Sequence, residues 1–318
     1  MNSQEKLLAR VFFKNKVLLA NGQAFEDLFT QIMTYSRPGF QPVNPQGKIG
    51  DRKNDGFESA LGRYFQVFAP EDSTIKESAT TKKIKTDFAG LHKHWQSQGV
   101  GIKEFYFVLN DKYNGAYPTT QTALNDLKTA YPTLDVADKF LCQHLEAELF
   151  LINDEQISYV VGGVLDPNNI GTVDYEILSE VLTHIRDLPP LPFIPGKLIA
   201  PILDEKIVFN GLVATRALLE NSWHQCGVVD DYFKFESNFA KMELRDKLNA
   251  LYVDAKLNNQ SALDSDRGDL IFIEILENMI PNDLNNPTRK LYREAAAIIM
   301  AAFFDSCDIF EEPIIGIS

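Results

Sequence analysis

Apolar side chains recur every three or four residues in two stretches of the first third of the chain. The stretches are GQAFEDLFTQIM at residues 22–33 and TTKKIKTDFAGLHKHWQ at residues 80–96. This spacing places the apolar side chains on one face, so each stretch predicts an amphipathic helix with one buried side. Two other runs, RYFQVFA at residues 63–69 and EFYFVL at residues 104–109, combine aromatic and β-branched side chains and predict short buried strands.

The segments between these elements complete an α/β pattern. Residues 36–56 contain three prolines and four glycines, which rules out a long helix and suits short strands joined by turns. Residues 120–158 predict a helix, a short strand and a further helix. The alternation of helices and strands predicts an α/β domain over residues 1–160.

The second half of the chain has the pattern of helices. Apolar positions repeat with helical spacing over residues 209–221, 231–257, 267–279 and 288–306. They are preceded by one helical pattern at residues 175–186 and by LPPLPFIPG, which has four prolines in nine residues. We therefore expect a linker region with one helix over residues 161–200 and an all-α domain over residues 201–318.

The composition of the 318 residues is that of a soluble globular protein, with 45% apolar residues and a formal net charge of −13. The longest apolar run, residues 295–304, is about half of the roughly 20 residues that span a bilayer, so we expect no membrane span and no membrane partner. Glu5, Lys6 and Arg10 interrupt the N-terminal stretch that a secretory signal would keep apolar. These features predict a cytoplasmic protein.

The cysteines and histidines offer little metal or redox chemistry. Cys142, Cys226 and Cys307 lie far apart without CxxC spacing, which argues against a disulfide framework or a cysteine zinc cluster. His92 and His94 are two residues apart in a predicted helix and therefore point to different faces. The chain also has no P-loop and no Rossmann glycine fingerprint.

The net charge is divided unequally along the chain. Residues 1–130 contain 17 Lys and Arg against 13 Asp and Glu, whereas residues 131–318 contain 14 against 31. An acidic surface repels nucleic acid, and a mildly basic one does not. The asymmetry predicts different partners for the two halves, with DNA on the first and protein on the second.

Three oxygen-bearing side chains follow one another in the basic part: Glu26 in the first predicted helix, Asp55 at the end of GDRKNDG, and Gln66 in the middle of RYFQVFA. Carboxylates on neighbouring elements can hold a divalent cation through hard oxygen ligands, and Mg²⁺ keeps several waters as well. A cation held in this way activates water for attack on a phosphodiester. The order of these residues predicts a site for Mg²⁺ or Mn²⁺.

Each of the three residues also has a structural explanation. Glu26 can be a solvated residue on a helix surface, and Asp55-Gly56 can be a simple turn. Gln66 is the most informative, because an amide in a central strand needs hydrogen-bond partners.

The segment GDRKNDG followed by a strand with Gln66 resembles the PD-(D/E)XK nuclease superfamily, and within it the Mrr-like branch. The resemblance implies a restriction-endonuclease-like mixed sheet flanked by helices. It also implies that Glu26, Asp55 and Gln66 bind the metal. The family has QxK on the strand, where the lysine orients or activates the attacking water, whereas this chain has QVF.

The missing lysine leaves two interpretations. In the first, a lysine from another element takes its place, with Lys82 and Lys83 at the start of the next helix as candidates and Lys53 as a weaker one. In the second, the domain has lost cleavage and binds DNA or acts as a scaffold.

The C-terminal part resembles the C-terminal domain of effector subunits of bacterial ABC-three-component systems. The runs DEKIVFNGL, VVDDYFKFE and above all FFDSCDIFEEP carry this resemblance. It implies an antiphage effector of Lamassu type whose partners are an SMC-like ABC ATPase and a small middle subunit. Tyr232 and Phe233 beside acidic residues are candidate exposed docking aromatics, with a buried helical core as the alternative.

The function predicted in this way is a metal-dependent DNA endonuclease effector that its ATPase partner activates. The alternative is a catalytically inactive nuclease-fold subunit of the same complex. Since nucleases of this fold cut one strand per active site, a double-strand break suggests a homo-oligomer, although no interface can be identified from the sequence.

Overall fold

The computed structural model describes residues 1–44, 52–70, 77–168, 170–189, 203–234, 238–305 and 309–313. By its internal contacts the chain divides into two units. We call Lys16–Val160 the sheet unit, and Met1–Asn15 together with Val161–Ser318 the helical unit. Cys307 and most of the proline-rich run lie outside the described residues.

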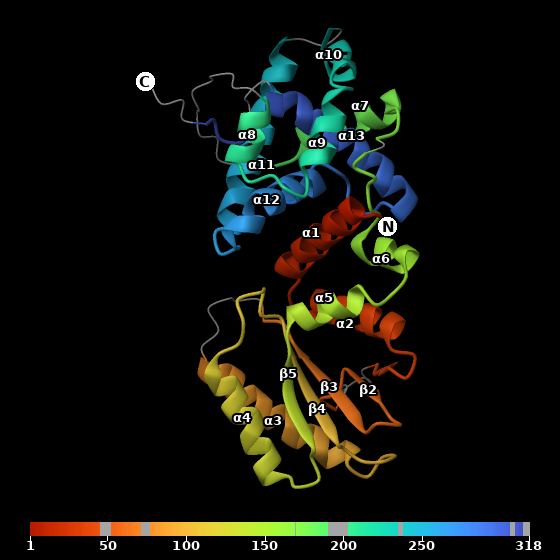
Figure 1. Cartoon of the computed structure of the whole chain (residues 1–318), viewed down its shortest axis with the longest axis vertical. Helices are drawn as coiled ribbons and strands as arrows, with labels where there is room; N and C mark the ends of the chain where they lie inside the picture. Colours follow the sequence, from red (N-terminus) through yellow and green to blue (C-terminus); the bar gives the residue numbers. More distant parts are fainter. Residues whose placement is uncertain are drawn as a thin grey trace. The chain divides into compact units, whose positions relative to one another are not determined.

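The sheet unit is built on five strands in the order β1-β2-β3-β4-β5 (Figure 1). The first three pair antiparallel, and β3, β4 and β5 pair parallel. The strands are β1 (Gln41–Pro42), β2 (Gly56–Glu58), β3 (Arg63–Phe68), β4 (Glu104–Leu109) and β5 (Val136–Phe140). The predicted mixture of strands and helices in the first part of the chain is thereby confirmed.

Helices cover the sheet on both faces. On one face α3 and α4 lie side by side, and on the other face α2 packs against β3 and α5 (Figure 1). The helices of this unit are α2 (Gly22–Ser36), α3 (Glu77–Trp95), α4 (Pro118–Ala130), α5 (Cys142–Leu149) and α6 (Asp154–Val161). The parallel crossovers through α3 and α4 bring the starts of both helices to the carboxyl ends of β3 and β4.

Side chains of β3 alternate between these two layers. Tyr64 belongs to the core between the sheet and α3. Phe65 faces the other layer, where its ring lies 5.7 Å from the ring of Phe29 on α2. Because alternate residues of a strand point to the same face, Gln66 and Phe68 lie on the side of Tyr64 and α3.

The helical unit is formed by helices from both ends of the chain. They are α1 (Ser3–Leu19), of which residues 3–15 belong here, α7 (Tyr175–Asp187), α8 (Leu203–Phe209), α9 (Arg216–Trp223), α10 (Gly227–Lys234), α11 (Asn238–Asn258), α12 (Asp264–Asn278) and α13 (Asn286–Asp305). The predicted helical character of the C-terminal part is confirmed. The helix at residues 3–19 and the place of residues 1–15 in this unit were not predicted from the sequence.

One of the predicted helix ranges is wrong. The range 209–221 is interrupted between α8 and α9, because Gly211 adopts a left-handed φ of 67°. The N–H groups of Ala214 and Thr215 then donate to the carboxylate of Asp269 on α12 at 2.9 Å each, instead of to a preceding turn. Within the predicted range 231–257, α10 reaches Lys234 and α11 runs from Asn238, and residues 235–237 lie outside the described residues.

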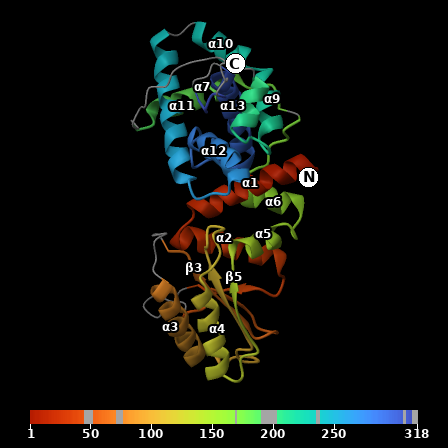
Figure 2. The same cartoon turned by 60° about the vertical axis from the view of Figure 1, so that its left-hand side comes forward.

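The apolar run at residues 295–304 forms the centre of α13. This helix packs against α7, α9 and α12, and residues 295–301 are fully buried (Figure 2). The run is therefore apolar because protein surrounds it. Within the described residues no helix is both long and apolar enough to span a membrane.

Candidate functional site

Asp55 lies where β2 separates from β3. Its backbone N–H donates to the carbonyl of Phe65 at 3.0 Å. The preceding residues Arg52 and Lys53 have left-handed φ values of 56° and 65°, which turn the chain away from the sheet. Oδ2 of Asp55 accepts the N–H of Val67 at 2.5 Å, so a carboxylate oxygen takes the place of a backbone carbonyl in the ladder. The side chain is 3% exposed.

Position 56 has to be a glycine because the Phe40 ring fills the space that a side chain would occupy. A Cβ at Gly56 would lie 2.2 Å from the ring of Phe40, which is itself buried. Gly56 pairs with Phe65 in the β2–β3 ladder rather than forming the centre of a turn. The Asp-Gly pair therefore begins a strand and aims the carboxylate at β3.

Gln66 and Asp55 form a buried polar pair, and Asn54, which precedes Asp55, is buried as well. Nε2 of Gln66 donates to Oδ2 of Asp55 at 2.7 Å. Among the described residues, Oε1 of Gln66 has no hydrogen-bond partner, and neither polar atom of the Asn54 side chain has one, although all three atoms are buried. Buried amide atoms normally have partners, so the unpaired Oε1 of Gln66 beside the Asp55 carboxylate indicates a place for a polar ligand or ion.

This donor set fits Mg²⁺ or Mn²⁺. Both ions prefer carboxylate, amide and water oxygens, and Asp55 and Gln66 offer the first two kinds. Within the described residues no three His, Cys, Asp or Glu side chains are grouped so that they could hold a metal. A cation bound here would therefore take much of its coordination shell from water, as Mg²⁺ commonly does.

Glu26 lies on α2, one turn after the helix begins, and is half-buried. The N–H of Gly22 donates to the carbonyl of Ala69 at 2.6 Å, so α2 begins at the end of β3. Glu26 and Gln66 thus belong to elements that meet at the same end of β3. However, α2 covers one face of the sheet, whereas Gln66 lies on the other face, beside α3. The role of Glu26 as a metal ligand stays a prediction.

The two candidate lysines of α3 point in different directions. Nζ of Lys83 pairs with Oδ2 of Asp87 at 2.6 Å and lies 5.3 Å from the centre of the Phe68 ring. Phe68 occupies the position of the QxK lysine and shares a face of β3 with Gln66. Lys82 is exposed and lines a groove between α3 and α4. The structure therefore brings Lys83, and not Lys82, towards the place of the missing lysine.

Asp87 is a residue that the sequence analysis missed. It is 3% exposed, and in addition to Lys83 it pairs with Nζ of Lys53 at 3.3 Å. The stem of Lys53 can approach α3 because Gly90 has no side chain, as a Cβ there would lie 3.1 Å from Cγ of Lys53. The available signal was an acid in the apolar stripe of the helix, next to Phe88 and four residues after a lysine.

The C-terminal motif FFDSCDIFEEP contributes to the core of the helical unit. The ring of Phe310 is 5.0 Å from that of Tyr252 and 5.3 Å from that of Phe304. Nζ of the buried Lys206 donates to the carbonyl of Phe304 at 3.0 Å. The motif therefore holds the end of the chain against the helices.

The predicted docking aromatics of α10 are only partly accessible. Tyr232 is 8% exposed, and Phe233 is half-buried with its ring 6.5 Å from that of Phe303. Of the two alternatives, the buried core is correct for Tyr232, whereas Phe233 remains partly exposed.

Comparison with known families identifies the helical part of the chain. Residues 176–311 match the model of C-terminal domain 10 of the ABC-three component (ABC-3C) systems. No curated protein and no solved structure matches the chain. The matched residues run from α7 past the end of α13 and support membership of an ABC-three component system through this C-terminal domain.

Proposed function

We propose that the chain is the metal-dependent DNA endonuclease effector of an ABC-three-component antiphage complex of Lamassu type. One observation supports the nuclease assignment: the buried Gln66 amide, whose Oε1 has no partner among the described residues, adjoins the Asp55 carboxylate on a mixed sheet. The mildly basic charge of the first 130 residues is compatible with a DNA substrate.

In the proposed site each residue has a distinct task. Asp55, Gln66 and Glu26 would hold Mg²⁺ or Mn²⁺, which when bound supplies an activated water and offsets phosphate charge. Lys83, fixed by its ion pair with Asp87, would donate a hydrogen bond to the attacking water or to a phosphate oxygen. Burial of Asp55 and Gln66 keeps these polar groups in a fixed geometry before DNA binds.

The proposed partners follow from the C-terminal domain. Membership of an ABC-three component system implies a multi-subunit assembly. We place an SMC-like ABC ATPase and a small middle subunit in it, with the ATPase activating cleavage. A second copy of the chain would supply the second strand cut of a double-strand break.

One observation favours a second candidate function, a nuclease-fold subunit without catalysis that binds DNA or acts as a scaffold. Phe68 stands where the superfamily has its lysine, and an aromatic ring cannot donate to a water. Under this alternative the Lys83–Asp87 pair stabilises α3 and takes no part in chemistry.

Plasmid cleavage by the assembled complex separates the two functions. The wild-type chain with its partners, ATP, and Mg²⁺ or Mn²⁺ is expected to nick or linearise plasmid DNA. Asp55→Asn should reduce the rate by at least about 100-fold, because it removes the carboxylate that holds the ion needed to activate water and offset phosphate charge. Asp126→Asn, which changes an exposed acid of the same unit, is the matched control and should cleave normally. Absence of cleavage by the activated wild-type complex would rule out the nuclease.

A further inference from the structure

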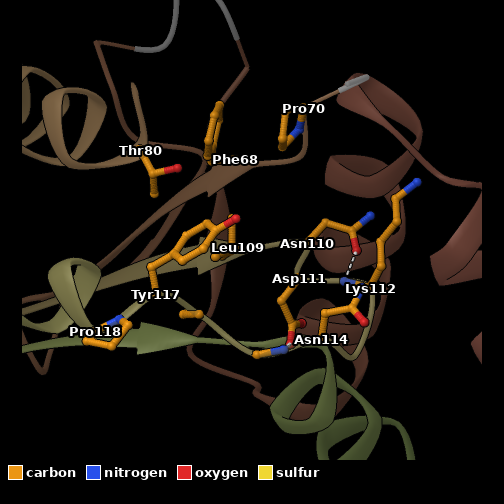
Figure 3. A pocket seen from close by; sticks show the side chains of 12 residues that line it. Phe68, Pro70, Thr80, Leu109, Asn110, Asp111, Lys112, Asn114, Tyr117 and Pro118 are labelled. Carbon is orange, nitrogen blue, oxygen red and sulfur yellow. Dashed lines mark hydrogen bonds between the residues drawn. The ribbon is translucent and has the colours of Figure 1, made fainter. Parts of the chain in front are cut away.

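A cavity of about 290 Å³ lies at the carboxyl ends of β3 and β4. Figure 3 shows Phe68 and Pro70 on one side of it and Tyr117 and Pro118 on the other, with polar residues of the β4–α4 loop at its end. The volume is close to the lower limit of roughly 300 Å³ for pockets that hold drug-sized molecules. It suits a single planar group.

The polar end of the cavity is fixed by bonds within the sheet unit. The Asn110 amide donates to the carbonyls of Val17 and Ala20 at 3.1 and 2.8 Å. The Asp111 carboxylate accepts the N–H groups of Gly115 and Cys142 at 2.8 and 2.9 Å. The cavity is therefore preformed, and its shape does not depend on a ligand.

The cavity is poorly suited to an anion. Lys112 lines the cavity and could bind an anion only through its charged amine. Burial lowers the pKa of this amine, and its Nζ already donates to the carbonyl of Leu18 at 2.8 Å. Pro118 occupies the first turn of α4, so one of the N–H groups that could bind an anion there is missing. The available surface is largely apolar and aromatic, and the Tyr117 side chain is 54% exposed.

The location connects the cavity to the candidate active site. In open α/β sheets, ligands bind outside the carboxyl ends of the strands. Phe68 lines this cavity, and its ring also lies 5.3 Å from Nζ of Lys83. A nucleotide whose phosphate lay near Lys83 would have its base within reach of the cavity.

We propose that this cavity binds one unstacked nucleobase of a DNA strand, with the base stacked on Tyr117. This inference rests on the proposed nuclease function and adds a substrate class to it. Bases are accessible only where strands are unpaired, so the chain should prefer single-stranded or distorted DNA over intact duplex. The Asn114 side chain lies at the polar end of the cavity, where its amide offers a hydrogen-bond donor and an acceptor for the edge of the base.

DNA binding without metal tests the cavity separately from cleavage. The full chain in EDTA is titrated into a labelled single-stranded oligonucleotide and into the matching duplex, with anisotropy as the readout. Tyr117→Ala should weaken single-strand binding roughly 5- to 100-fold, the effect of losing one base–aromatic stack, and change duplex binding little. Tyr117→Phe keeps the ring and should bind like wild type. Tyr159→Ala removes a tyrosine of similar exposure, 58%, in the same unit and is the control.

A second readout requires no variant. An oligonucleotide containing 2-aminopurine should brighten or quench on binding to the wild-type chain when the probe base leaves its neighbours and stacks on the ring. Unchanged probe fluorescence, equal single-strand affinity of Tyr117→Ala and wild type, or an equal loss for duplex would each overturn the proposal. Tighter binding of a free mononucleotide than of the strand would overturn the assignment to DNA.

The outcomes separate this inference from the proposed function. If Tyr117→Ala weakens single-strand binding but the activated complex never cleaves DNA, the base-binding cavity is supported and the nuclease function is ruled out. If the complex cleaves DNA but Tyr117→Ala binds single strands as wild type does, the nuclease function is supported and base binding in the cavity is ruled out.

Discussion

The ion pairs of Asp87 determine which lysine side chains lie towards the candidate site. Its buried carboxylate holds Lys83 at 2.6 Å and Lys53 at 3.3 Å, so both amines are drawn to the face of β3 that carries Gln66. Lys82, the neighbour of Lys83, projects from the other side of α3 because adjacent residues of a helix point about 100° apart. Side-chain direction therefore distinguishes two lysines that sequence position alone leaves equivalent.

Replacement of these adjacent lysines gives a matched pair of variants. Lys83→Met should lower the cleavage rate of the activated complex by roughly 100-fold, since it removes a donor aimed at developing charge. Lys82→Met removes the same charge from the exposed side and should leave the rate within about threefold of wild type. Equal losses in both variants would indicate nonspecific attraction of DNA, and no loss in either would favour the inactive nuclease fold.

At the residue scale, part of the site was predictable. The proximity of Asp55 and Gln66 was expected from the order of these residues and from the family resemblance, and antiparallel pairing of β2 with β3 accounts for it. The burial of Asn54 could not be recognised, since an asparagine before Asp-Gly looks like ordinary turn composition. The direction of Lys83 depends on how α3 packs against β3, which no local pattern in the sequence specifies.

At the scale of elements, the helical unit depends on a close approach between α12 and the segment after α8. Gly268 of α12 lies under this segment, and a Cβ there would be 2.0 Å from the carbonyl oxygen of Asn210. The segment leaves the helical path at Gly211 and donates backbone N–H groups to Asp269. Helical periodicity predicted a continuous helix here because the apolar spacing continues through the interruption, whereas the bonds to Asp269 are long-range.

The contact at Gly268 can be tested with two glycines. Gly268→Ala should lower the free energy of unfolding by roughly 1–3 kcal/mol, because backbone on both sides must separate to admit the methyl group. Gly227→Ala, at the start of α10 where nothing lies within 4 Å, should be neutral or stabilising by up to about 1 kcal/mol. Chemical denaturation measures both. Equal effects of the two substitutions would contradict the close approach.

Glu294 on α13 gives the helical unit a dependence on pH. Burial raises the pKa of this carboxyl, and the opposing charge of Lys290 offsets that effect only in part. The unfolded chain therefore ionises Glu294 at lower pH than the folded chain does. As a consequence, the contribution of Glu294 to the free energy of unfolding is greatest below the pKa of the unfolded chain, about 4.3. This contribution is lost as pH rises through the raised pKa of the folded chain.

Glu294→Gln removes this dependence while preserving the shape of the side chain. The substitution should raise the melting temperature at pH 8, where the buried glutamate is charged, and raise it less at pH 5. Thermal unfolding at the two pH values measures the difference. A lower melting temperature at pH 8 than that of wild type would mean that the charge of Glu294 is stabilising.

At the scale of the whole molecule, the chain is not two consecutive halves. The first 15 residues belong with Val161–Ser318, where Phe12 lies 4.1 Å beneath the guanidinium of Arg293 on α13. Composition and charge indicated two parts with different character, and that division is reflected in the mixed sheet and the helices. The membership of the N-terminus depends on contacts nearly three hundred residues apart in sequence, which periodicity does not encode.

This discontinuous arrangement predicts which elements lose hydrogen-exchange protection when a side chain of α1 is removed. Phe12→Ala should cost roughly 3–5 kcal/mol, as for a buried phenylalanine, and should reduce hydrogen-exchange protection in α13. Protection in β3 and β4 should be affected less. Loss of protection in those strands with α13 unchanged would contradict the assignment of residues 1–15 to the helical unit.

The central claim is that Asp55, Gln66 and Glu26 form a site for a divalent cation, and direct binding of Mn²⁺ tests it. Electron paramagnetic resonance of the isolated full chain counts free and bound Mn²⁺ without requiring partners or DNA. We expect wild type and Asp126→Asn to bind the ion and Asp55→Asn to lose it, with Mg²⁺ competing. No binding by wild type, or equal binding by Asp55→Asn, would contradict the account.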